Sequence, residues 1–217
     1  MITRRKALVL TATGLVAGGA YGLWNGNATE GGLVDLGAAN AQTIEIEDIS
    51  IGDANAPVKV VEYASFTCPH CANFHRDTFK DFRRDYIETG KVHFTYREVF
   101  FDRYGLWAAM IARCAGQDRY FGVAEVLYQT QGEWARQGDP ASVAASLKRI
   151  GAQAGLSAEQ ADACLQDGEM AQSLLAWYEG NASSDGIRST PSFLINGEVH
   201  SGNMSLSQLG ALVDEAS

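Results

Sequence analysis

Cysteine is scarce in this chain of 217 residues, with only four present, and positive charge is in the minority. Lysine and arginine together number 17 against 26 aspartates and glutamates, which gives a formal net charge of −9. Because nucleic acids select basic protein surfaces, this balance argues against a nucleic-acid partner. The chain also lacks a repeat of fixed period and any low-complexity stretch. Its 46% hydrophobic and 20% charged residues are typical of a globular protein, and its length suits one domain, with or without an insertion.

A long uncharged run lies at the N-terminus, in "MITRRKALVLTATGLVAGGAYGLW". Basic residues at 4–6 precede the uncharged residues 7–24, which is the layout of an export signal or a short membrane anchor. This basic cluster, and the polar "NGNATEGG" after the run, argue against a buried helix. Small residues suit cleavage after Ala41 or after Ala20, and "TRRKAL" partly resembles a twin-arginine signal. We therefore expect residues 1–41 to be an export signal or membrane anchor plus linker, and the remainder to be exported, where disulfides persist.

A pattern of strands and helices follows the linker. Alternating and β-branched runs predict strands, and apolar positions at three- to five-residue intervals predict helices. In chain order the pattern predicts strands at 43–52 and 58–65, a helix at 69–88, a strand at 91–101, helices at 104–115, 118–131, 142–154, 157–166 and 168–184, a hairpin at 191–202 and a helix at 205–215. The sequence therefore predicts an α/β sheet domain that is interrupted by about 80 helical residues.

The stretch "SFTCPHCANFH" places Cys68 and Cys71 three positions apart. A zinc site that includes His75 would account for the pair, but the chain has no second close pair of cysteines. Haem attachment would need histidine where the chain has Ala72. A purely structural bridge would close a very short loop and constrain the unfolded chain little. Redox exchange between the two cysteines is the favoured interpretation.

Helix geometry gives the two cysteines different environments. Cys68 is expected at the N-terminus of the helix, where unpaired N–H groups and the helix dipole favour a thiolate, and Cys71 one turn further in. Pro69 suits the first helical turn, and His70 can assist the thiolate if it is protonated or donates an N–H group. A thiolate that is stabilised in this way favours the reduced state, so the disulfide would be an oxidant.

Three features together resemble the DsbA-type thiol:disulfide oxidoreductases of the thioredoxin superfamily, which are proteins of the bacterial periplasm. They are the segment "VVEYASFTCPHC", the later "STPSFLING", and the helical block between them; the similarity covers about 44–217. The resemblance implies a thioredoxin-like α/β fold with an inserted all-helical domain. Residues 42–102 and 187–217 would form the thioredoxin-like domain, and residues 103–186 the insertion. In this family the pKa of the reactive thiol falls as low as roughly 3.5.

The resemblance also implies roles for single residues. Cys68 would be the attacking and leaving thiol and Cys71 the buried resolving thiol. Glu62 would be the buried acid that exchanges a proton with Cys71, although a strand residue that points to solvent is the alternative. Thr190 and a cis Pro191 would bind an extended substrate like an added strand. The best-known strong oxidases have valine where this chain has Thr190, so the oxidising strength is left open.

The remaining cysteines and histidines have less specific surroundings. Cys114 and Cys164 both fall in the helical block, where we expect a disulfide between two helices, with free buried cysteines as the alternative. The chain offers no metal-ligand spacing, so we interpret His75, His93 and His200 as surface or core residues, and no metal or cofactor is expected.

The sequence thus predicts an exported, monomeric periplasmic oxidase that passes its disulfide to reduced, unfolded secretory proteins through a mixed disulfide. The resemblance implies recharging by a membrane partner of the DsbB type, linked to quinone. An isomerase or reductase of the same superfamily is the nearest alternative. A non-catalytic binding or chaperone module is the alternative from another class.

Overall fold

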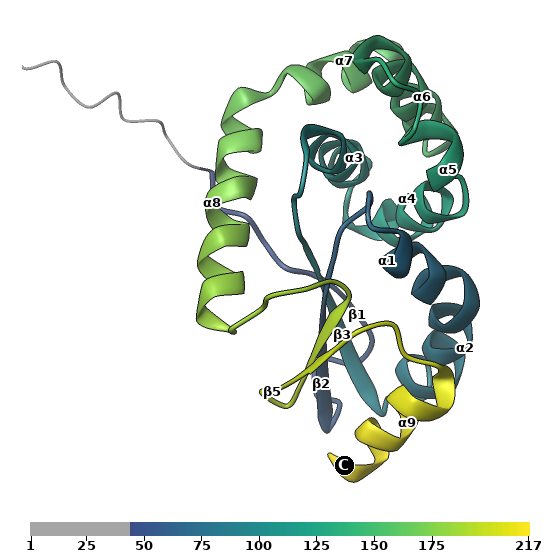
Figure 1. Ribbon diagram of the computed structural model, residues 1–217, viewed down its shortest axis with the longest axis vertical. Helices are drawn as coiled ribbons and strands as arrows, with labels where there is room; N and C mark the ends of the chain where they lie inside the picture. Colours follow the sequence, from purple (N-terminus) through teal and green to yellow (C-terminus); the bar gives the residue numbers. More distant parts are fainter. Residues whose placement is uncertain (1–43) are drawn as a thin grey trace, which may run out of the picture. The chain divides into compact units, whose positions relative to one another are not determined.

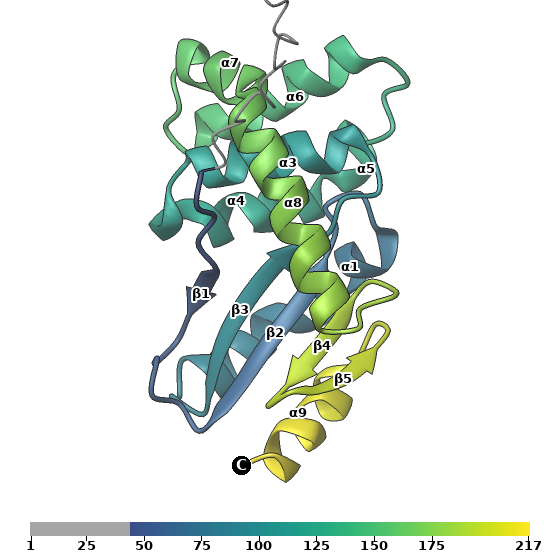
Figure 2. The same cartoon turned by 90° about the vertical axis from the view of Figure 1, so that its left-hand side faces the viewer.

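A mixed five-stranded sheet forms the lower half of the computed structural model, which describes residues 44–217 (Figures 1 and 2). The strand order is β1-β3-β2-β4-β5. The strands are β1 (Ile49–Ile51), β2 (Val58–Ala64), β3 (Val92–Glu98), β4 (Ser192–Ile195) and β5 (Glu198–Ser201). The first is shorter than the predicted 43–52, because only its last residues pair with β3. The expected export signal lies outside the described residues, within which no helix is long and apolar enough to cross a membrane.

The central strand β2 carries the chain into the CPHC stretch. It runs parallel to β3 and antiparallel to β4, and its β-branched residues suit a strand that is covered on both faces. Because side chains alternate along a strand, Val60 and Glu62 share one face, and Val61 and Tyr63 share the other. Val60 belongs to the main hydrophobic core, whereas Tyr63 belongs to a smaller cluster with Ala182 of the last inserted helix. The two faces of the sheet therefore have different partners.

A long helical segment covers the Glu62 face of the sheet. It comprises α1 (Pro69–Phe74), a π-helical part (His75–Phe79), α2 (Lys80–Phe82) and a second π-helical part (Arg83–Ile87). The predicted helix at 69–88 is confirmed, but its two π-helical parts were not predicted. Figure 1 shows this segment and α9 (Leu206–Glu215) on one side of the sheet, with the end of α8 (Gly168–Ser184) on the other.

The expected helical block lies between β3 and β4. Its elements are α3 (Arg103–Cys114), α4 (Gln117–Gln129), α5 (Gln131–Trp134), α6 (Pro140–Gln153), α7 (Ala158–Gln166) and α8. The predicted helix at 118–131 ends earlier, and Thr130 separates α4 from the short α5. A disulfide between Cys114 and Cys164 joins α3 to α7, which confirms the expected pairing.

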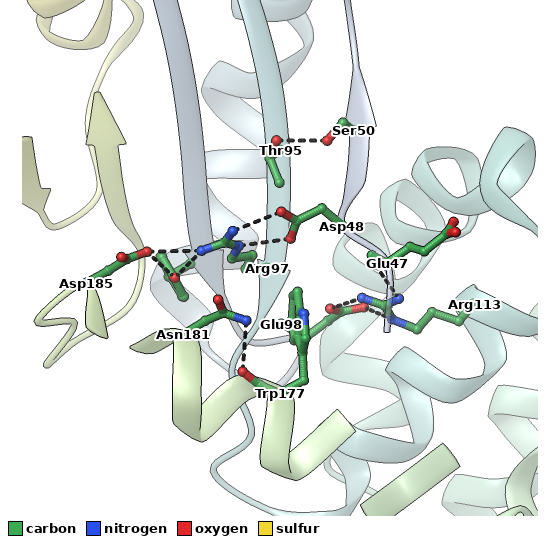
Figure 3. Close-up of polar contacts among 11 residues, drawn as sticks. Glu47, Asp48, Ser50, Thr95, Arg97, Glu98, Arg113, Trp177, Asn181 and Asp185 are labelled. Atoms are coloured by element: carbon green, nitrogen blue, oxygen red, sulfur yellow. Dashed lines mark hydrogen bonds and ion pairs between the residues drawn. The ribbon is translucent and has the colours of Figure 1, made fainter. Parts of the chain in front are cut away.

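Two arginines tie the sheet to the helical block (Figure 3). Arg97 of β3 donates to Asp48 at 2.8 and 2.9 Å and to Asp185 at 3.0 Å. Arg113 of α3 donates to both carboxylate oxygens of the buried Glu98 at 2.7 Å each. Asp185 follows α8 directly. The ion pair between Arg97 and Asp185 therefore fixes the start of the segment that returns to β4.

Candidate active site

Cys68 and Cys71 lie where the chain passes from β2 into α1. Cys68 is the N-cap residue of that helix, and Pro69 occupies its first turn as expected. Cys68 keeps 6% of its surface exposed, whereas Cys71 keeps none. Pro69 and His70 are exposed beside them. The sulfur of Cys68 is therefore the one that a substrate can reach from solvent.

The second part of the site is the loop before β4. The Thr190-Pro191 peptide bond is cis, as predicted. The loop is fixed by hydrogen bonds from the Gly202 N–H to the Pro191 carbonyl at 2.8 Å and from the Ser192 hydroxyl to the Ser189 carbonyl at 2.8 Å. These bonds hold the Thr190 carbonyl against the active-site thiol, and the Cys68 sulfur donates to it at 3.6 Å.

Hydrogen bonds lower the pKa of Cys68 to about 5. The largest contribution is donation from the Cys71 thiol, and partial burial opposes it. Further donors are the Thr190 side chain and the backbone N–H groups of Cys71 and His70. The Thr190 hydroxyl is buried without a well-formed hydrogen bond among the described residues, so it is free to serve the thiolate. The contribution of His70 comes from its backbone N–H.

The pKa of Cys71 shifts the other way, far above its ordinary value. Burial is the main cause, followed by donation to Cys68 and by the negative charge of Glu62. The two sulfurs therefore differ in role: Cys68 is stable as a thiolate, and Cys71 must carry a proton whenever it is not bonded to another sulfur.

Glu62 is fully buried, which excludes the alternative of a strand residue that points to solvent. Its carboxylate lies 3.0 Å from Nε2 of His75, which is itself buried. The sequence indicated only an ordinary surface or core histidine at position 75, and its contact with Glu62 was missed. Its position four residues after Cys71 was the available signal, because residues at this spacing share one face of a helix.

Two further polar anchors were also missed. The side-chain amide of Gln131 in α5 donates to the carbonyls of Phe66 and Cys68 at 2.8 and 3.0 Å. Asp102, the N-cap of α3, accepts from the hydroxyl of Thr67 at 2.8 Å. Both anchors tie the turn before Cys68 to the helical block. Among residues 44–217 no group of three or more metal-ligating side chains lies together.

A family model described as thioredoxin matches residues 45–215. The chain belongs to the thioredoxin family. The fold expected from the sequence, a thioredoxin-like sheet with an all-helical insertion, is therefore confirmed.

Individual relatives indicate which members of the thioredoxin family this chain resembles. A Rickettsia felis protein named as a protein-disulfide oxidoreductase is 31% identical over 174 residues, which are 80% of this chain and 61% of that protein. The chain thus spans about three fifths of the length of that relative. The crystal structure of α-DsbA1 from Wolbachia pipientis has a TM-score of 0.72 and 27% identity, and covers 82% of this chain and 94% of that one. BdbD from Bacillus subtilis shares the fold, with a TM-score of 0.68, 20% identity and coverage of 78% and 92%. These matches confirm the resemblance to DsbA-type thiol-disulfide oxidoreductases.

Proposed function

We propose that this thioredoxin-family chain is a thiol-disulfide oxidase, which donates the Cys68–Cys71 disulfide to reduced polypeptides. The observation that carries the proposal is the opposite shift of the two thiol pKa values. The pKa of Cys68 falls to about 5, whereas that of Cys71 rises. Stabilising the Cys68 thiolate favours the reduced enzyme over the disulfide, and a disulfide whose reduced form is favoured is readily given away.

The reaction follows from the exposure of the two sulfurs. A substrate thiolate attacks Sγ of Cys68, the Cys68–Cys71 bond breaks, and its electron pair leaves with Cys71. The buried Cys71 then takes up a proton, because its raised pKa disfavours the thiolate. A second substrate thiolate attacks the substrate sulfur of the mixed disulfide, and Cys68 leaves as the stabilised thiolate. The substrate is oxidised by two electrons and the enzyme is reduced by two.

The substrates are proposed to be extended, unfolded secretory proteins, which would lie along the Thr190-Pro191 loop. The contact between the Thr190 carbonyl and Cys68 supports this, because it places the backbone of the loop beside the reactive sulfur. Export to the periplasm, action as a monomer and recharging by a DsbB-like, quinone-linked membrane partner complete the proposal. The basic and uncharged segments within residues 1–41 support export.

A redox equilibrium with glutathione tests the direction of the reaction. The oxidised protein is mixed with glutathione buffers of graded ratio and, separately, with a reduced dithiol peptide. We expect the Cys68–Cys71 disulfide to be reduced in buffers that leave ordinary structural disulfides intact, and the peptide to be oxidised stoichiometrically. The Cys68→Ser variant should lose both reactions. A Cys114→Ser/Cys164→Ser variant is the matched control and should retain both.

Two other results would assign the protein to the alternatives. A strongly reducing equilibrium, together with reduction or reshuffling of substrate disulfides, would identify a reductase or isomerase. A binding module would show two results together. The parent would carry out no thiol exchange, and the Cys68→Ser variant would prevent aggregation of unfolded proteins as well as the parent does.

A further inference from the structure

His75 lies at the first turn of the π-helical part that follows α1, directly behind the active site. Its ring stacks on Tyr128 of α4, with 4.2 Å between ring centroids, and lies 4.7 Å from the ring of Phe79. Only 8% of the residue is exposed. These contacts hold the imidazole so that Nε2 meets the Glu62 carboxylate at 3.0 and 3.2 Å from its two oxygens.

Glu62 connects this histidine to the resolving cysteine. The charge of Glu62 is close enough to Cys71 to raise the pKa of that thiol, and both residues are fully buried. Cys71 therefore has an acid–base group beside it but no surface of its own through which to exchange a proton with water. A substrate that covers Cys68 would further separate Cys71 from solvent on that side.

His75 also lines a cavity of about 360 Å³ on the side of the helix that faces α4. The buried residues that line the cavity are Phe79 and Phe121 besides the histidine. Its remaining walls are the exposed charged residues Lys80, Arg83, Arg84, Glu88 and Glu125. Because these charged side chains are exposed, the cavity opens to water. The Thr190-Pro191 loop, along which the substrate is expected to lie, contributes no residue to it.

The groups that face His75 come from every element that packs on it. They are Glu62 of β2, Tyr96 of β3, Tyr128 of α4 and the charged residues of the cavity wall. Tyr96 and Tyr128 hydrogen-bond to each other at 2.5 Å, and burial raises the pKa of both hydroxyls well above the ordinary value. Neither tyrosine therefore ionises in the working range, which leaves the carboxylate and the imidazole to carry a proton.

We propose that His75 is a positioning residue and proton carrier that links Glu62 to water in this cavity, so that Cys71 exchanges its proton while substrate covers Cys68. The inference rests on the proposed oxidase function. In the forward step the Cys71 thiolate, released with the electron pair of the broken disulfide, needs one proton, and the Glu62 carboxylate beside it passes that proton on from His75. The His75 imidazolium gives its proton to the Glu62 carboxylate, which transfers it to Cys71, and the neutral imidazole then takes a proton from water or buffer in the cavity. Re-oxidation runs the same transfers in reverse.

Single-turnover oxidation of a reduced dithiol peptide by His75→Gln tests the proposal. The glutamine amide can still donate to Glu62 but cannot carry a proton. We expect the rate to fall at least about 10-fold and to depend less on pH than that of the parent. The thiolate titration of reduced Cys68 should keep its midpoint. His200→Gln, which removes an imidazole from the edge strand β5, is the matched control and should behave like the parent.

Chemical rescue separates proton carriage from a structural role. In His75→Ala the deleted ring leaves space that is continuous with the cavity, and added imidazole should restore the rate in a saturable manner, with no effect on Cys68→Ser. A His75→Gln variant with the parent rate and pH profile overturns the proposal, as does a slow, folded His75→Ala that imidazole does not restore. Should His75→Ala not fold, the His75→Gln rate and pH profile decide alone. A parent protein that cannot oxidise the peptide at all instead contradicts the proposed function.

Discussion

Gln131 and Cys68 are joined by a buried hydrogen bond that links the helical block to the active site. The side-chain amide of Gln131 donates to the Cys68 carbonyl at 3.0 Å and to the Phe66 carbonyl at 2.8 Å, and the residue is only 5% exposed. One side chain thus holds both ends of the turn that presents the reactive cysteine. The position of Cys68 depends on a residue 63 positions further along the chain.

Replacing Gln131 by alanine should destabilise the protein by about 1–3 kcal/mol, because two buried carbonyls lose a donor. Urea unfolding of the oxidised and reduced forms measures the loss. Gln129→Ala is the matched control, since Gln129 is exposed and bonds only to Glu125 within the described residues. It should change the free energy of unfolding by less than about 0.5 kcal/mol. Equal losses in the two variants would contradict a special role for Gln131.

Thr190→Val should raise the pKa of Cys68 by about one unit. The substitution keeps the shape of the side chain but removes a hydroxyl that has no hydrogen-bond partner among the described residues and lowers the pKa of the adjacent Cys68 thiol by offering the thiolate a donor. Hydrogen bonds to charged groups contribute about 1.5–3 kcal/mol. Thr190→Ser retains the hydroxyl and should leave the pKa near the parent value. The pH dependence of alkylation of reduced protein by iodoacetamide measures both variants. A value for Thr190→Val at or below that of the parent would show that the hydroxyl does not stabilise the thiolate.

The stability of the reduced protein should rise with pH relative to that of the oxidised protein. In the folded, reduced state the pKa of Cys68 is about 5, whereas an unfolded cysteine titrates near about 8.5. Between these pH values the Cys68 thiol has lost its proton in the folded state and kept it in the unfolded state. The contribution of Cys68 to the free energy of unfolding of the reduced protein therefore grows with pH. It is complete above about pH 8.5 and lost as the pH falls through about 5. Melting temperatures of both forms across this range measure it, and a constant difference would contradict the pKa assignment.

The Cys114–Cys164 disulfide should contribute about 4 kcal/mol to the free energy of unfolding, because it closes a loop with a sequence separation of 50. Urea unfolding of a Cys114→Ala/Cys164→Ala variant under oxidising conditions measures this. In excess dithiothreitol the parent loses the same cross-link, so the two curves should converge. If the two proteins still differ in free energy of unfolding by the same amount in dithiothreitol, the cross-link is not the cause. The lower stability of the variant would then come from lost packing of the two side chains.

Local sequence patterns predicted the parts of the site that depend on local structure. A β-branched strand followed by Cys-Pro-His-Cys places Cys68 at a helix N-terminus by helix geometry alone. The cis bond before Pro191 was instead implied by the resemblance of residues 189–197 to the DsbA-type family. The burial of Glu62 was also expected, because a single carboxylate in an apolar strand that leads into a reactive site favours a buried, functional position over an exposed one.

The partners supplied by tertiary packing were beyond such patterns. His75 is an acid–base group only because α4 places Tyr128 against its ring and β2 places Glu62 at its Nε2. Gln131 reaches Cys68 only because Thr130 ends α4 and turns the short α5 toward the site. The spacing of four residues from Cys71 places His75 on the helix face of the resolving cysteine, but it does not name Glu62 as the partner. Both contacts join segments that meet only in the folded chain.

The ultraviolet absorbance of the thiolate, followed in a pH titration of the reduced protein, tests the central claim most directly. The Cys68→Ser variant is titrated in parallel to identify which sulfur ionises. We expect a single transition with a midpoint close to 5, absent from that variant. A midpoint near about 8.5 would contradict the account, because it would leave two ordinary cysteines with no preference for giving their disulfide away.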